Sequence, residues 1–145
     1  MLLRSKKKSR SYRKSNRLTH SEKSTNRLKE LGFCDHVFAA DATQPVPVLE
    51  IMEKLTNGEM ADVTINNVNI TDTAMTSILC TKNTGTVYFF SMATSFTKAA
   101  LGAEGIGADV DMILGNGYAH DHAMISIDLL RRNAILMKLF EERYI

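Results

Sequence analysis

Four short apolar runs, each followed by a turn and a helical pattern, limit most strongly what this chain can fold into. The runs are residues 36–40, 61–66, 86–91 and 111–114. The third and fourth are nearly continuous in apolar character, as strands buried on both faces require. Strands that alternate with helices form parallel sheets covered by helices. The sequence therefore predicts an α/β fold built on a doubly wound, Rossmann-like parallel sheet.

Helical patterns lie before and between these runs. Residues 22–31 end at Gly32, which is a natural helix stop, and residues 44–56 carry Pro45 in the first turn. Further apolar stripes predict helices at 72–80, 95–103 and 121–143, and Asn133 is the expected break in the last one.

The length of 145 residues fits a single domain, and no stretch approaches the roughly 18 apolar residues of a membrane helix. The start of the chain has no apolar stretch long enough for a signal peptide, so a cytoplasmic location is expected. Cys34 and Cys80 lie far apart without metal-ligand spacing, which favours reduced, packed thiols.

Residues 1–20 differ sharply in charge from the rest. They hold eight of the 18 basic residues and no acid, which leaves ten basic residues against 16 acids in residues 21–145. A segment with so few apolar residues and no period is predicted to be a disordered basic arm ahead of the folded domain. A solvated tail is the favoured interpretation. Binding of nucleic acid or a partner through the arm is the alternative.

Each predicted strand ends in small or polar residues, at the edge of a parallel sheet where ligands bind. Taken singly, each end is explained as well by ordinary turn chemistry, and the four together support both interpretations equally. Neither the glycines at 115 and 117 nor those at 102–107 fit the dinucleotide-binding pattern. His120 and His122 lack a third ligand, so no metal site is predicted.

Three long and unusual runs, at 61–69, 85–105 and 111–119, resemble the L-erythro-3,5-diaminohexanoate dehydrogenase family. Residues 21–32 with 35–37 look like the second half of a medium-chain dehydrogenase cofactor domain. The resemblance covers residues 20–145 and corresponds to a C-terminal portion. It implies an oxidoreductase of lysine fermentation that deaminates a diamino acid oxidatively to 5-amino-3-oxohexanoate, and that is homo-oligomeric at full length. NAD is the implied cofactor, with NADP left open, and no membrane is implied.

The resemblance also implies a cofactor-binding rim, although it assigns no catalytic residue. Asp41, Ala42 and Thr43 would lie near the adenine. The residues expected near the nicotinamide ribose and ring are Asn66, Asn67, Val68, Ser91, Met92 and Ala93. Gly115 and Asn116 would follow the next strand on the same rim.

The chain departs from the family before residue 21. The family's cofactor domain begins with a first strand, a glycine-rich phosphate loop, a helix and a second strand, and none of these is visible in residues 1–20. We therefore expect a partial sheet that lacks its first two strands, with the run at 36–40 left without a neighbour. We also expect a chain that does not turn over substrate by itself.

Overall fold

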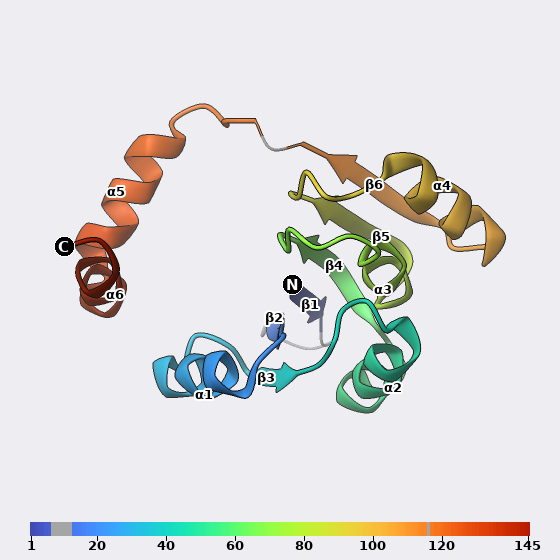
Figure 1. Cartoon of the computed structure of the whole chain (residues 1–145), viewed down its shortest axis with the longest axis horizontal. Helices are drawn as coiled ribbons and strands as arrows, with labels where there is room; N and C mark the ends of the chain where they lie inside the picture. Colours follow the sequence, from blue (N-terminus) through green and yellow to red (C-terminus); the bar gives the residue numbers. More distant parts are fainter. Residues whose placement is uncertain (7–12, 116) are drawn as a thin grey trace.

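The computed structural model of the chain describes residues 1–6, 13–115 and 117–145, and its described strands form one sheet in the order β3-β2-β1-β4-β5-β6 (Figure 1). The strands are β1 (Leu2–Lys6), β2 (Arg13–Thr19), β3 (His36–Ala39), β4 (Ala61–Asn66), β5 (Thr81–Phe89) and β6 (Val110–Leu114). The helices are α1 (Glu22–Leu31), α2 (Pro45–Thr56), α3 (Ala74–Leu79), α4 (Phe96–Gly105), α5 (His122–Arg132) and α6 (Ala134–Tyr144).

The predicted α/β class and its partial Rossmann-like parallel sheet are confirmed. β2 pairs with β3, β4 with β5, and β5 with β6, all in parallel. The break expected at Asn133 is also present, because this residue ends α5 and caps α6. Its side-chain oxygen accepts hydrogen bonds from the backbone N–H groups of Ile135 and Leu136, each at 3.1 Å.

The first 20 residues differ from the disordered arm expected from sequence. Residues 2–6 and 13–19 form β1 and β2, while residues 7–12 lie outside the described part of the chain. A six-residue connection is too short for the crossover of a dozen or more residues that parallel strands need. β1 therefore runs antiparallel to β2, and it also pairs antiparallel with β4.

The hairpin fills the two central positions of the sheet, where a doubly wound sheet ordinarily has its first two strands. β3 consequently has a neighbour, contrary to the expectation for residues 36–40, since Asn16 to Thr19 pair with it in parallel. Backbone hydrogen bonds hold this pairing, and they need no apolar run in the sequence. Met1 and Leu18 add two buried side chains to the core. The alternative, binding of nucleic acid or a partner through this basic segment, stays a prediction.

Helices cover the two faces of the sheet unequally (Figure 1). α3 and α4 pack on one face of β4 and β5, where Ile78 and Ala99 join Val87 and Phe89 in a buried cluster. α1 packs on β2 and β3. No residue of α5 or α6 is buried. None of the helices in the described residues is long and apolar enough to cross a membrane.

Candidate functional site

A pocket of about 300 Å³ opens near the point where the strand order switches. From β1 to β3 successive strands are added on one side, and from β4 to β6 they are added on the other. β2 to β6 all run in one direction, so their carboxyl ends share one edge, which is the usual position of ligands in such sheets. The start of the antiparallel β1 lies at the same edge. The lining residues are Met1, Arg17, Leu18, Thr19, His20, Ser24, Leu28, Ala40, Asp41, Ala42, Thr43, Asn67, Val68, Ile70 and Thr73.

Five of the predicted cofactor-binding residues meet in this pocket: Asp41, Ala42, Thr43, Asn67 and Val68. They come from the ends of β3 and β4, which are separated in the sheet by the hairpin. One oxygen of Asp41 accepts hydrogen bonds from the backbone N–H of Thr43 at 2.9 Å and from its hydroxyl at 2.7 Å. The backbone bond first, and the hydroxyl bond second, lower the pKa of Asp41. A fixed, ionised carboxylate therefore stands at the pocket rim.

Asn66 lies behind the rim rather than on it. Its side chain is only 1% exposed. The amide nitrogen donates to the hydroxyls of Thr73 and Ser77, each at 2.9 Å, and the amide oxygen accepts from the backbone N–H of Val68 at 3.1 Å. These bonds use the side chain internally, so its contribution is to hold the turn that presents Asn67 and Val68.

The residues that follow β5 and β6 lie farther along the same edge. Ala93 lines a second pocket of about 270 Å³ with Thr73, which also borders the first pocket. The hydroxyl of Ser91 accepts a hydrogen bond from the backbone N–H of Ala93 at 3.1 Å, and the side chain of Met92 is 84% exposed. Gly115 follows β6, its N–H donating to the carbonyl of Phe89, and Asn116 lies outside the described residues.

Sequence reasoning did not assign the pocket residues contributed by the hairpin. Met1, Leu18, Thr19 and His20 all line it. The Thr19 hydroxyl lies 2.5 Å from that of Thr25 and donates to the carbonyl of Ser21. The position of Leu18, Thr19 and His20 just before the predicted helix at 22–31 was the one sequence feature that could have indicated them. β2 has no apolar run that would mark where a strand ends. Thr19 and His20 stand where dinucleotide-binding sheets carry the acidic residue for the ribose.

Polar groups line the rim, but the described residues provide no glycine-rich loop there of the kind that binds a diphosphate. A diphosphate is held by backbone N–H groups of a glycine-rich loop between the first strand and a helix N-terminus. Because β1 is antiparallel, its carboxyl end lies at the opposite edge of the sheet from the pocket. At the pocket edge, α1 is already capped by Ser21, whose hydroxyl accepts from the backbone N–H of Ser24 at 3.3 Å.

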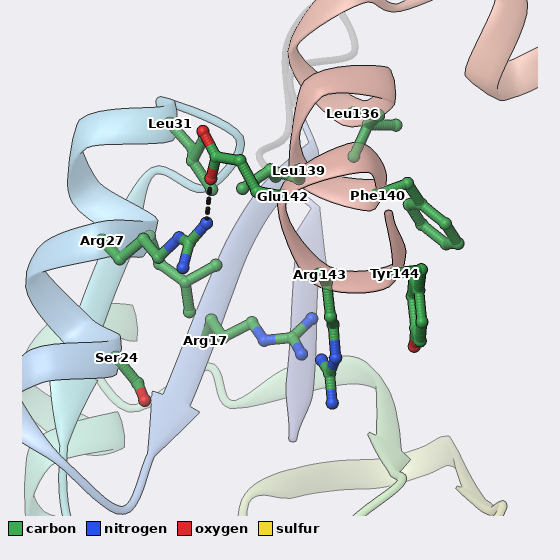
Figure 2. Close-up of a pocket in the computed structure, with 11 residues that line it drawn as sticks. Arg17, Ser24, Arg27, Leu31, Leu136, Leu139, Phe140, Glu142, Arg143 and Tyr144 are labelled. Carbon is green, nitrogen blue, oxygen red and sulfur yellow. Dashed lines mark hydrogen bonds and ion pairs between the residues drawn. The ribbon is translucent and has the colours of Figure 1, made fainter.

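A wider groove of about 730 Å³ lies between α1 and α6 and shares Arg17, Ser24 and Leu28 with the rim pocket (Figure 2). Arg27 is paired with Glu142 across it at 2.8 Å. Among the described residues, no carboxylate lies within ion-pair distance of Arg17 or Arg143. These guanidinium groups make this side of the rim electropositive, which favours anionic ligands.

Among the described residues, no group of three His, Cys, Asp or Glu side chains is arranged to hold a metal ion. The His120 imidazole instead contacts the neighbouring Asp121 at 2.8 Å on the surface. The ring of His122 stacks on Tyr118, with centroids 4.5 Å apart. The two histidines therefore have separate surroundings.

The sheet order and its parallel strand pairs define the molecule as a Rossmann-like α/β domain. No family model matches the sequence. The chain is 54% identical over 128 residues to the L-erythro-3,5-diaminohexanoate dehydrogenase of Acetoanaerobium sticklandii, and 50% identical over 109 residues to the enzyme of that name from Fusobacterium nucleatum. These matches confirm the resemblance. They cover 88% and 75% of this chain, which spans 37% and 32% of the two relatives.

A solved structure supports the fold alone. The crystal structure of AibC matches 69% of this chain with a TM-score of 0.50 and 18% identity. The match covers 26% of that chain.

Proposed function

We propose that this chain carries the nucleoside-binding rim of an NAD-dependent oxidoreductase that acts on a CH–NH2 group of L-erythro-3,5-diaminohexanoate. The observation that carries the proposal is the 54% identity to a dehydrogenase of that name, over a region that includes the rim. The pocket supports it, because residues from the ends of β3 and β4 converge there. The product would be 5-amino-3-oxohexanoate, as lysine fermentation requires.

The residues present would bind and orient rather than react. Asp41, with its lowered pKa, is an acceptor for hydroxyl or amino groups of a nucleoside, and the exposed amide of Asn67 can both donate and accept. A bound nicotinamide supplies the hydride chemistry. No side chain of the rim is assigned as an acid or base.

We also propose that the chain does not oxidise the diamino acid alone. The hairpin occupies the sheet positions from which a phosphate loop would start, so the described residues provide no glycine-rich loop to hold the diphosphate. The rim would then bind the nucleoside end only weakly.

Calorimetry with NAD and with adenosine tests both parts of the proposal. The purified chain should bind both ligands with similarly weak affinity and should form no NADH from the diamino acid. Asn67→Ala should weaken adenosine binding further, whereas Asn69→Ala, an exposed change outside the pocket, should not. Tight NAD binding by the unmodified chain would contradict the inference that it lacks a loop to hold the diphosphate.

A chimera tests separately whether the rim can serve in a dehydrogenase of this kind. Residues 1–20 are replaced by the upstream region of the Acetoanaerobium sticklandii dehydrogenase, which restores its own first strands. This chimera should bind NAD and release NADH with L-erythro-3,5-diaminohexanoate. A chimera that folds, as judged by circular dichroism, but binds no NAD would contradict the proposed role of the rim.

A further inference from the structure

One face of the sheet carries an apolar surface that none of the helices in the described ranges covers. Register pairing places Ile65 beside Tyr88 and Tyr88 beside Ile113, so the three form one row across β4, β5 and β6. The next row ends at Asp111, which pairs with Thr86. Met112 and Val110 point to the opposite face, where they pack against the buried cluster under α4.

This surface is both exposed and aromatic. Ile113 is 48% exposed, and Phe90, just beyond β5, is 46% exposed and stacks on Tyr88 with ring centroids 6.1 Å apart. Connected apolar surface of this kind marks an interaction site in a folded protein. Parallel strands also ordinarily have both faces covered.

α5 carries the complementary surface and is equally uncovered. Met124, Ile127 and Leu130 recur at helical spacing on one side of it, with Met124 62% and Ile127 42% exposed. Arg131 lies one turn beyond Ile127 at the edge of this stripe. In a doubly wound fold, the helix after a strand packs back on its own sheet. Here α5 lies on the opposite side of the picture from β5 and β6 (Figure 1).

α5 lies away from β5 and β6 together with α6. Only Asn133 separates the two helices, and they pack on each other. α6 in turn is paired to α1 through Glu142 and Arg27, at the β3 side of the sheet. In this position the α5 of the same chain does not cover β4 to β6.

We propose that α5 of a second copy of this chain covers the open face of β4 to β6, and that the exchange is reciprocal. This inference does not rest on the proposed function, since it uses a surface away from the rim pocket. A helix that follows a strand runs antiparallel to it. In that orientation, Ile127 laid over the Tyr88–Ile113 row brings Arg131 over Asp111.

The spacing of the two surfaces agrees with this arrangement. Ile127 and Arg131 are about 6 Å apart along a helix axis. Ile113 and Asp111 are about 6.6 Å apart along a strand. The exposed Asp111 and the exposed Arg131 thus meet as opposite charges when the apolar rows meet.

Sedimentation velocity of the full chain over a range of concentrations tests the proposal. We expect a dimer of twice the 16.2 kDa chain mass. Ile113→Glu on the sheet and Ile127→Glu on α5 should each raise the dimer dissociation constant roughly tenfold or more. Val46→Glu, at a site 60% exposed on α2, is the matched control and should leave it unchanged. All three sites are exposed, and circular dichroism verifies that each variant keeps its fold.

Mixing the two weakened variants separates exchange between copies from closure within one chain. The Ile113→Glu chain has an intact α5, and the Ile127→Glu chain has an intact sheet face, so the mixture restores one of two contacts. The mixture should dimerise more tightly than either variant alone. Asp111→Arg should weaken the dimer, and the added change Arg131→Asp should restore it. A monomer at every concentration, or a dimer indifferent to both Glu substitutions, overturns the proposal.

Discussion

The side-chain amide of Asn66 donates to the hydroxyl of Ser77 across 2.9 Å, joining the end of β4 to α3 beneath the candidate site. The same amide also donates to Thr73 and accepts from the N–H of Val68. One buried side chain thus links the turn that presents the rim to the helix that supports it.

Replacing Asn66 by Ala should lower the free energy of unfolding by about 1–3 kcal/mol, because buried hydroxyl and N–H groups lose their partner. The measurement is urea denaturation followed by circular dichroism. Asn67→Ala, one residue on at an exposed position, is the control and should stay within about 0.5 kcal/mol of the parent. Equal effects at both positions would show that the network does not stabilise the rim.

The two cysteines should differ strongly in reactivity. Cys80 is buried, and this burial raises the pKa of its thiol to about 12, whereas Cys34 is half-buried. Because the thiolate is the reactive form, a maleimide should label Cys34 in the native chain and Cys80 only after unfolding. Mass spectrometry of the parent chain and of Cys34→Ser counts the labels. Rapid native labelling of Cys34→Ser would contradict the burial of Cys80.

Gly85 should tolerate no side chain. A Cβ there would lie 2.7 Å from the side chain of Thr81 and 2.8 Å from the carbonyl oxygen of Lys82. Gly85→Ala should therefore cost about 1–3 kcal/mol of stability through overpacking. Gly105→Ala is the matched control, since nothing lies within 4 Å of its added Cβ, and the change should be neutral or stabilising. Thermal unfolding of both variants measures the difference, and similar losses would contradict the close packing at Gly85.

The Asp41 carboxyl should titrate below the ordinary pKa of an aspartate. Its lowered pKa stabilises the folded state above the unfolded pKa, and this contribution disappears as the pH falls through the folded pKa. Thr43→Val removes the hydroxyl bond but keeps the larger backbone bond, so the pKa of Asp41 should rise only part of the way. Carbon-detected NMR titration of both chains measures it. An unchanged titration would mean that the hydroxyl does not reach Asp41 in solution.

Sequence patterns predicted the parts of the fold that depend on side-chain periodicity. The four apolar runs became β3 to β6, and the expected helices appeared with ends shifted by a few residues. The break at Asn133 was readable because one side chain caps the following helix. Part of the candidate site could also be predicted from the sequence, because polar residues follow each predicted strand.

The hairpin could not be read from its residues. β2 has the sequence Arg-Lys-Ser-Asn-Arg-Leu-Thr, which has no apolar run, and its strand character comes from backbone pairing with β1 and β3. Nor could the sequence show that Asn66 turns inward while Asn67 stays on the surface. Successive residues of a strand point to opposite faces of the sheet, and the strand ends at Asn66. Two neighbouring asparagines therefore have different surroundings.

The sequence by itself determined an α/β chain related to part of a dehydrogenase, because periodicity and identity are properties of the residues in order. Tertiary structure alone decided which strands fill the centre of the sheet, which polar side chains reach the rim, and which apolar faces stay uncovered. These features depend on hydrogen bonds and packing between segments far apart in the chain, and no local pattern encodes the partner of a given strand or helix.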